Sequence, residues 1–202
     1  MGYLYTRMGP SPIYQTSPLI VLLSGWARSG KDTAAALLID EVDFIRVAFA
    51  DALKEDVAQL VGSHILASCH TASKDKPLVE IVDAAFPDGQ TLRDLLIERA
   101  AAVRATEPDT YARIVAAAIG TSGRYVITDW RYHNEYDVLR KTLPSAIILR
   151  VRIVRSMVIS LNEPSEHDLD GAHVDAVVHN DGSISDLRDK IKAVVHPYLH
   201  HS

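Results

Sequence analysis

Short apolar runs alternate with helical patterns along the chain from Leu19 onward. The runs that we predict to be strands are Leu19–Ser24, Phe44–Ala50, Arg124–Asp129, Ala146–Ile153 and Val174–His179. Continuous apolar runs of this length, separated by helices, are typical of strands that are buried on both faces of a parallel sheet. The pattern therefore predicts an α/β fold in which about five parallel strands are flanked by helices.

Helical periodicity, with apolar residues three and four positions apart, marks the stretches between these strands. The predicted helices are Lys31–Val42, Asp51–Gly62, Lys76–Ala85, Thr91–Ala105, Asp109–Ile119, Asn134–Lys141 and Ser183–Val195. About 70 residues separate the second strand from the third, which is too many for a single crossover connection. We therefore expect a helical insertion over the carboxyl ends of the strands, where open α/β sheets bind their ligands.

Composition and charge narrow the class of protein. The chain has 202 residues, of which 48% are hydrophobic and 23% charged, as in soluble globular proteins. Its longest aliphatic run, Leu19–Leu23, is too short to span a bilayer, and Met1–Pro18 lacks the apolar segment of a secretory signal. Cys69 is the only cysteine, so no intrachain disulfide can form, which suits a cytoplasmic location. The net charge of −5 argues against non-specific binding of duplex DNA, so an anionic ligand needs a local basic pocket.

The most informative motif runs from Gly25 to Thr33, with the sequence GWARSGKDT. It follows an apolar strand and opens a helix, which is the context in which a P-loop binds phosphate. Glycines at both ends allow successive backbone N–H groups to point inward, and the helix N-terminus adds positive charge. Lys31 would then reach the β- and γ-phosphates of a nucleotide. The position after the lysine, usually Ser or Thr, is Asp32, and a hydroxyl follows at Thr33.

The segment RSGKDT resembles the P-loop of the bacteriophage-type deoxynucleoside monophosphate kinases, in which an acid replaces the usual hydroxyl. Further segments resemble that family in the same order: FADALKE at 49–55, LRDLL at 92–96, EPDTY at 107–111, DWRYHNE at 129–135, SEHDLD at 165–170 and DAVVHNDGS at 175–183. The Gly-Thr-Glu that usually follows the arginine segment is missing, and Tyr111 stands where the family has tryptophan. Both departures fall in the region that binds the acceptor.

The resemblance implies a P-loop kinase fold with a helical acceptor-binding insertion and a short lid. A single kinase domain would cover residues 18–202, after a loosely ordered N-terminal arm at 1–17. The core would comprise 18–50, 123–154 and 173–202, the insertion 51–122 and the lid 155–172. The implied reaction is ATP-dependent phosphorylation of a nucleoside or deoxynucleoside monophosphate to the diphosphate, with ATP and Mg²⁺ as cofactors.

The resemblance also implies three sets of site residues. Those expected to act in catalysis are Lys31, Asp32, Asp129, Arg131 and Arg155. Those expected to bind ATP are Gly25, Arg28, Ser29, Gly30, Lys31, Thr33, Arg152 and Asn180. Those expected to bind the acceptor are Asp51, Lys54, Arg93, Asp109, Tyr111, Arg113 and Glu135. We expect no metal ion held directly by the protein, only Mg²⁺ arriving with ATP, with Asp32 or Thr33 beside it.

Several of these residues also have a purely structural interpretation. Asp129 and Arg131 follow the third strand, where an ion pair commonly closes a strand end. Asp32 in the first turn of a helix stabilises the helix dipole, and Asp109 after a proline is an ordinary helix N-cap. Arg93 and Lys54 on a helix could simply face solvent. The helix after Asn180 is expected to be capped by Ser183.

Two other functions remain open from the sequence. A kinase that phosphorylates a hydroxymethylated base in DNA would share this P-loop, and a groove rimmed by Arg99, Arg104 and Arg113 would favour it. A nucleotide-binding protein without transferase activity is the third hypothesis, against which Lys31, Asp129 and Arg131 argue. The expected partners are small nucleotides, with nucleic acid only under the second hypothesis, no membrane, and a second copy in a homodimer as an open option.

Overall fold

The structure is a computed structural model that describes residues 17–69, 71, 75–78, 89–158 and 167–199. Its described strands are β1 (Leu19–Ser24), β2 (Ile45–Val47), β3 (Arg124–Ile127), β4 (Ile147–Val154) and β5 (Ala176–His179). They form one sheet in the order β2-β3-β1-β4-β5, and every neighbouring pair is parallel. The predicted fold class, a parallel sheet of about five strands flanked by helices, is confirmed.

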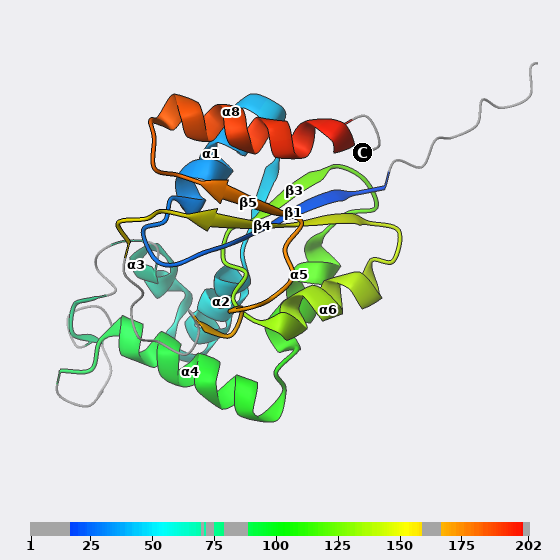
Figure 1. Cartoon of the computed structure of the whole chain (residues 1–202). Helices are drawn as coiled ribbons and strands as arrows, with labels where there is room; N and C mark the ends of the chain where they lie inside the picture. Colours follow the sequence, from blue (N-terminus) through cyan, green and yellow to red (C-terminus); the bar gives the residue numbers. More distant parts are fainter. Residues whose placement is uncertain (1–16, 70, 72–74, 79–88, 159–166, 200–202) are drawn as a thin grey trace, which may run out of the picture.

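Helices cover both faces of the sheet (Figure 1). The described α-helices are α1 (Lys31–Val42), α2 (Phe49–Val61), α3 (Leu66–Cys69), α4 (Leu92–Thr106), α5 (Thr110–Ala118), α6 (His133–Thr142) and α8 (Ile184–Val195). The 3₁₀ turns whose bounds lie wholly in the described part of the chain include η1 (Ser63–Ile65) and η4 (His196–Tyr198). α1 and α8 lie on one face of the sheet, whereas α2, α5 and α6 lie on the other, with α4 beyond α2. Within the described residues, no helix has the length and apolar character that a membrane crossing requires.

β1 is buried along its whole length and contributes to two hydrophobic cores. One side of the strand packs with α1 and α8 through Leu19, Val21 and Leu23. The other side packs with the helices on the opposite face through Ile20 and Leu22. Burying one such side chain contributes roughly 1.5–3 kcal/mol to folding. β1 is therefore a rigid base for the loop that leaves its carboxyl end.

The predicted strand Phe44–Ala50 is wrong in its second half, because α2 begins at Phe49. The cause lies far along the chain, in the carboxylate of Asp129. Its two oxygens accept hydrogen bonds from the backbone nitrogens of Phe49 and Ala50, at 3.0 and 2.7 Å. The first N–H groups of a helix need acceptors from outside the helix, and Asp129 supplies them. A local pattern contains no trace of this contact.

Two further differences concern the region between α2 and α4. The turns η1 and α3, over 63–69, were not predicted, and they pack Ile65 and Cys69 into a third small hydrophobic core with α2 and α4. The predicted helix Lys76–Ala85 lies mostly outside the described residues. The same holds for the predicted N-terminal arm and for 159–166 of the predicted lid.

One polar cluster joins α2, α4 and α5 within the predicted insertion. The guanidinium of Arg99 in α4 donates two hydrogen bonds to Asp56 in α2, at 2.8 and 3.0 Å. The hydroxyl of Tyr111 in α5 donates to the same carboxylate at 2.8 Å. The hydrogen bonds from Arg99 hold the pKa of Asp56 below its usual value. Burial and the Asp56 carboxylate raise the pKa of Tyr111.

We expect Tyr111→Phe to lower the free energy of unfolding by about 1 kcal/mol, because Asp56 loses one donor but keeps Arg99. Urea denaturation measures this change. Tyr136→Phe is the matched control, since Tyr136 packs against the sheet core and no hydrogen bond of its hydroxyl is found in the described part of the chain. The control should change stability by less than about 0.5 kcal/mol. Equal losses in both variants would contradict the role of the Tyr111 hydroxyl.

Candidate functional site: the phosphate loop and its surroundings

The loop between β1 and α1 depends on glycine at two positions. Gly25 and Gly30 have φ angles of 135° and 104°, in the region that side chains disfavour. A β-carbon on Gly25 would collide with the backbone oxygen of Ile153 in β4, and one on Gly30 would collide with the side chain of Asn180. The loop is therefore held against two neighbouring segments at points where only glycine fits.

Lys31 begins α1 and folds back over this loop. Its Nζ donates to the carbonyl oxygens of Gly25 and Trp26, at 2.6 and 2.8 Å. The ammonium group thus lies at the Gly25 end of the loop, close to the positive end of the α1 dipole. The hydroxyl of Ser29 within the same loop is buried and has no hydrogen-bond partner among the described residues. A glycine cradle, a lysine and an unpaired donor fit the phosphates of a nucleotide.

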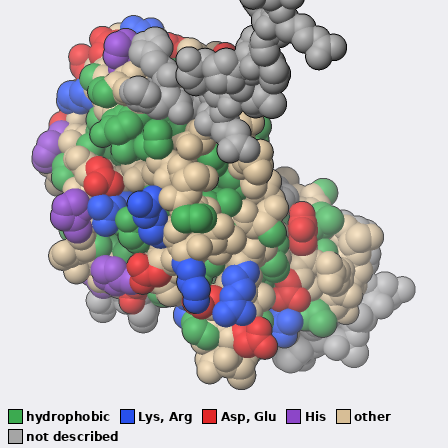
Figure 2. Space-filling view, turned by 90° about the vertical axis from the view of Figure 1, so that its right-hand side faces the viewer, with side chains coloured by type: hydrophobic (Ala, Val, Ile, Leu, Met, Phe, Trp, Pro, Cys, Tyr) green, Lys and Arg blue, Asp and Glu red, His purple; other side chains and the backbone are tan. Residues whose placement is uncertain are grey.

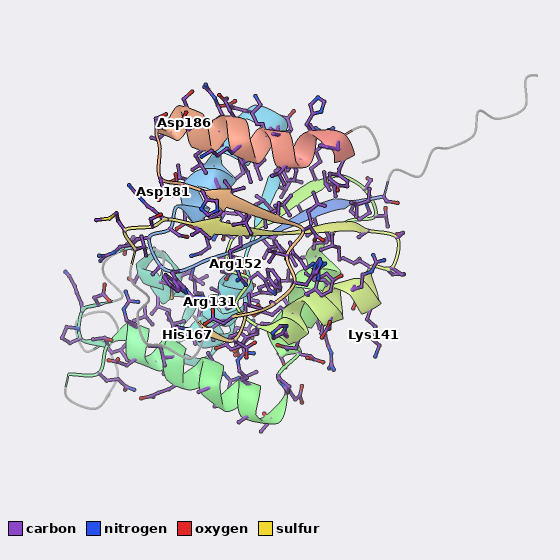
Figure 3. All side chains as sticks on the ribbon, in the orientation of Figure 1. Arg131, Lys141, Arg152, His167, Asp181 and Asp186 are labelled. Carbon is purple, nitrogen blue, oxygen red and sulfur yellow. The ribbon has the colours of Figure 1, made fainter. Side chains whose placement is uncertain are left out.

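Asn180 supports the loop from the segment that follows β5. Its Nδ2 donates to the carbonyl oxygen of Ser29 at 2.8 Å. The next residue, Asp181, accepts hydrogen bonds from the backbone nitrogen and the hydroxyl of Ser156, at 2.7 and 3.1 Å. Figure 3 shows Asp181 near the beginning of α8, which Ser183 caps as predicted. The phosphate loop, the end of β4 and the end of β5 are thus linked by polar contacts.

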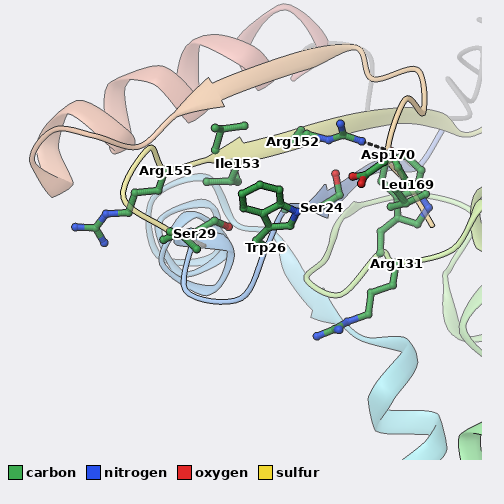
Figure 4. Close-up of a pocket in the computed structure, with 13 residues that line it drawn as sticks. Ser24, Trp26, Ser29, Arg131, Arg152, Ile153, Arg155, Leu169 and Asp170 are labelled. Atoms are coloured by element: carbon green, nitrogen blue, oxygen red, sulfur yellow. Dashed lines mark hydrogen bonds between the residues drawn. The ribbon is translucent and has the colours of Figure 1, made fainter. Parts of the chain in front are cut away.

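Asp129 and Arg131 lie in the segment that follows β3, beside this loop. Asp129 is committed to capping α2, and burial raises its pKa, although the two backbone N–H groups and Arg131 oppose that shift. Arg131 extends beneath the loop toward the beginning of α2 (Figure 4). The structure therefore makes Asp129 a residue that positions α2, and it places Arg131 at the candidate site.

Glu135, which was expected to contact the acceptor, is buried. One of its oxygens accepts hydrogen bonds from the backbone nitrogens of Arg131 and Tyr132, at 2.9 and 3.0 Å. The guanidinium of Arg104 lies 4.0 Å from the other oxygen and 3.4 Å from the centre of the Tyr132 ring. Burial raises the pKa of Glu135 to about 8. Its contacts shape the turn that carries Arg131.

Arg46 in β2 is a residue of this region that sequence reasoning missed. The carboxylate of Asp51 accepts hydrogen bonds from Arg46 at 2.5 Å and from Lys54 at 2.9 Å. Burial favours the neutral acid, but these two donors outweigh it and lower the pKa of Asp51. The hydrogen bond to Asp51, with smaller contributions from Asp129 and Asp32, raises the pKa of Arg46. Its position on a strand, just before the FADALKE segment, was the only available signal.

Two cavities flank the phosphate loop. Cavity A, about 220 Å³, lies at the Gly25 end, between the loop and the segments that follow β3 and β4 (Figure 4). Cavity B, about 450 Å³, lies on the other side, between α1 and the segment that follows β5. Residues that line cavity B include Arg28, Gly30, Lys31, Asp32, Thr33, Asn180 and Ile184. Arg155 lines both cavities.

The arginines of the fourth strand face different partners. Arg150 forms an ion pair with Asp175 at 3.0 Å, and this pair lines neither cavity. Arg152 lines cavity A, where it donates to the carbonyl oxygen of Leu169 at 2.5 Å. Figure 3 shows Arg152 and Arg131 on the same side of the sheet. Cavity A thus receives arginines from three places: Arg131, Arg152 and Arg155.

The other residues expected at the acceptor do not meet at this site. Arg93 donates to Asp75 at 2.5 Å. Asp109 occupies the N-cap position of α5, but its side chain does not cap the helix and instead pairs with Arg113 at 3.5 Å. Tyr111 lines cavity C, a third cavity of about 510 Å³ between α2, α4 and α5. In the described part of the chain, no cluster of three or more His, Cys, Asp or Glu is placed to hold a metal ion.

The buried Glu135 predicts a pH-dependent stability. Its pKa is about 8 in the folded chain, whereas the ordinary pKa of an exposed glutamate is 4.5. The folded state therefore holds a proton that the unfolded state has released between these two pH values, so stability falls as pH rises through that window. Relative to Glu135→Gln, the wild type should lose up to about 1.4 kcal/mol of stability per pH unit there. Denaturation from pH 5 to 8 tests this, and parallel profiles for the two proteins would contradict it.

No protein family and no curated protein matches this chain by sequence. Solved structures are similar to it. A crystal structure of TT1252 from Thermus thermophilus is 18% identical, with a TM-score of 0.47, and the match covers 90% of this chain and 98% of that one. The APS kinase of Mycobacterium tuberculosis is 12% identical, with a TM-score of 0.45 and coverage of 89% and 98%. The shikimate kinase of Aquifex aeolicus is 12% identical, with a TM-score of 0.40 and coverage of 91% and 99%. These similarities concern the fold.

Proposed function

We propose that this protein transfers the terminal phosphoryl group of ATP to a nucleoside or deoxynucleoside monophosphate. The observation that carries the proposal is the phosphate loop with Lys31, which lies between two cavities. A phosphotransferase has to hold a donor and an acceptor on opposite sides of the transferred group. The ordered motifs that resemble the bacteriophage-type family support a nucleotide as the acceptor.

Cavity B suits the donor. Arg28, Gly30 and Lys31 line cavity B and would hold the phosphates of ATP, and Asn180 would keep the loop in place. Gly25 and Ser29 line cavity A and would contact the phosphates from the other side of the loop. Thr33 and Asp32, both in the first turn of α1, would lie beside the Mg²⁺ that accompanies ATP. ATP supplies the phosphoryl group, and its Mg²⁺ offsets the charge of the phosphates.

The contribution of the chain to the transfer is positive charge at fixed positions. Negative charge spreads over the oxygens of the transferred group, and preorganised cations stabilise it. Lys31 lies at the Gly25 end of the loop, and Arg131, Arg152 and Arg155 line the adjacent cavity A. Asp129 is a positioning residue, because its oxygens hold the beginning of α2.

The acceptor phosphate would approach from the side of Arg131 and of the Arg46–Asp51–Lys54 cluster. Guanidinium groups suit this task because they bind phosphate through two parallel hydrogen bonds. Arg93 stays a proposed ligand of the acceptor phosphate, and binding would require it to exchange Asp75 for phosphate. A cytoplasmic location and a homodimer stay expectations from the sequence.

Two observations favour a free nucleotide over hydroxymethylated DNA as the acceptor. The arginines expected to rim a groove for DNA each hold a partner, namely Asp56 for Arg99, Tyr132 for Arg104 and Asp109 for Arg113. The face opposite the site, at the amino ends of the strands, shows acidic and basic side chains interspersed, so the described part of that face does not extend a basic surface for DNA around the molecule (Figure 2). The arginines of cavity A support transferase activity over nucleotide binding alone, because a protein that only binds a nucleotide needs no cations on the acceptor side.

A panel of nucleoside and deoxynucleoside monophosphates and hydroxymethylated DNA, each incubated with ATP and Mg²⁺, tests the proposal through the release of ADP. We expect ADP release that depends on at least one monophosphate. Release that depends on the DNA alone would establish the second hypothesis. ATP binding without any phosphoryl transfer would support the third hypothesis, a nucleotide-binding protein without transferase activity.

Lys31→Ala should reduce kcat/KM at least tenfold, on the scale of about 1.4 kcal/mol or more of transition-state stabilisation. The fold should persist, because the ammonium donates to carbonyl groups of the loop and not to the hydrophobic cores. Lys141→Ala is the control, since Lys141 lies at the far end of the molecule (Figure 3). Steady-state kinetics and circular dichroism provide the two readouts. A Lys31 variant with near-normal kcat/KM would remove the lysine from catalysis.

Asp32→Ala should lower kcat at least about tenfold and raise the Mg²⁺ concentration that gives half-maximal rate, if Asp32 holds the hydration shell of the ion. Stability should change by less than about 1 kcal/mol, the scale of one acid at a helix N-terminus. Asp40→Ala is a matched control, because Asp40 is an exposed acid at the opposite end of α1. Normal turnover with reduced thermal stability would make Asp32 a helix-end charge only.

A further inference from the structure

Trp26 occupies the first variable position of the phosphate loop, and the proposed function gives it no role. It is 38% exposed, whereas the only other tryptophan, Trp130, is 3% exposed. The indole N–H of Trp130 donates to the carbonyl oxygen of Tyr132 at 3.0 Å. For Trp26, no hydrogen bond of the indole N–H occurs among the described residues. Exposure alone is common among the apolar side chains of this chain, but the Trp26 ring also lines a cavity beside the phosphate loop, where a ligand could reach it.

The ring of Trp26 forms one wall of cavity A (Figure 4). Ile153 and Leu169 add apolar surface to the cavity, and Arg131 and Arg152 add charge. An apolar pocket with a few placed polar groups is the composition of small-molecule sites. Its volume of about 220 Å³ is below the ~300 Å³ of pockets that enclose a whole drug-sized ligand. Cavity A therefore suits one ring system, with the remainder of the ligand outside it.

The position of cavity A relative to Lys31 identifies which substrate it takes. The Lys31 ammonium lies 2.6 Å from the carbonyl oxygen of Gly25 and 2.8 Å from that of Trp26, and both residues line cavity A. A ligand in cavity A would thus lie beside the charge that holds the transferred phosphoryl group. It would also lie on the other side of the loop from cavity B. This is the acceptor side.

The aromatic residue that the family resemblance suggested for the acceptor is engaged elsewhere. The hydroxyl of Tyr111 bonds to Asp56, and Tyr111 lines cavity C with Arg99. Tyr111 is part of the contact between α2, α4 and α5. Of the aromatic residues at the phosphate loop itself, Trp26 is the exposed one in the described structure.

We propose that Trp26 is the stacking surface for the base of the acceptor nucleotide, in cavity A. The base would lie against the indole ring, and the phosphate of the acceptor would point toward Arg131. Stacking on an aromatic side chain discriminates for planar rings and tolerates different bases. This inference rests on the proposed function and adds the residue that selects an acceptor with a base.

Intrinsic fluorescence of the whole protein tests the inference without turnover. We expect each of the four common deoxynucleoside monophosphates that is phosphorylated to quench the tryptophan signal on binding. Ribose 5-phosphate, which has sugar and phosphate but no base, should not. Trp26→Phe should remove most of the quench, because Trp130, which also lines cavity A, is only 3% exposed, and it should keep the acceptor KM within about threefold, since a stacking ring persists.

Steady-state kinetics of Trp26→Ala give the second readout. The acceptor KM should rise by about ten- to a hundredfold, and the KM for ATP should stay within about twofold. Met157→Ala is the control, because Met157 is 90% exposed and does not line cavity A. It should change neither constant. If Trp26→Ala fails to fold, the wild-type quench and the Phe variant still decide.

The outcomes separate the two proposals. Phosphorylation of monophosphates with an unchanged acceptor KM in Trp26→Ala overturns the inference alone. Equal quenching by ribose 5-phosphate and by the nucleotides also overturns it alone. Failure of every monophosphate to bind or react, while ATP binds, overturns the proposed function and this inference with it.

Discussion

The close packing of the phosphate loop against its neighbours is the constraint on which the site depends. Gly25 lies against the backbone of β4, and Gly30 lies against Asn180 beyond β5. A side chain at Gly25 would push the loop off the sheet, because the backbone of β4 cannot yield, and one at Gly30 would displace the Asn180 side chain that holds the loop. Because β1 is buried on both faces, the loop cannot relax by moving its base. The walls that the loop gives to the two cavities are therefore rigid as well.

Acidic and basic side chains have different roles in the site: two acids hold the backbone in place, and the cations border the cavities. Glu135 is buried and Asp129 partly buried. Their oxygens accept hydrogen bonds from backbone N–H groups at the beginning of α2 and in the turn after β3. They shape the chain without presenting their charge to a ligand. The cations Lys31, Arg131 and Arg155 border the cavities. Such a division suits anionic substrates, because an unpaired carboxylate beside phosphate would be repelled. Asp32, which lines cavity B, and Asp170, which lines cavity A, depart from it. A cation beside Asp32 is therefore part of the proposal.

Features that arise from local patterns could be predicted from the sequence. The strand–loop–helix at the phosphate loop, the parallel sheet and the Ser183 cap all follow from patterns within a few residues. Contacts between distant segments could not be predicted, and they account for the differences. The carboxylate of Asp129 ends β2 early by starting α2, although the two lie far apart in sequence. The engagement of Tyr111 by Asp56 is of the same kind, and no spacing in the chain signals it.

The end of β4 relates the two sides of the site to each other. Arg155, which borders both cavities, precedes Ser156, and Ser156 is bonded to Asp181. Asp181 follows Asn180, which donates to the phosphate loop. The contacts on the donor side therefore fix the position of the segment that carries Arg155. Transfer of a phosphoryl group requires donor and acceptor to be aligned within a fraction of an ångström. The segment at the end of β4 is bonded to Asp181 and also lines cavity A. It aligns the two sides of the site because the residues that make these contacts are adjacent in sequence. The same geometry explains why an exposed tryptophan in the loop would matter for the acceptor: the side chains of Asn180 and Asp181 join the loop that carries it to the segment that carries Arg155.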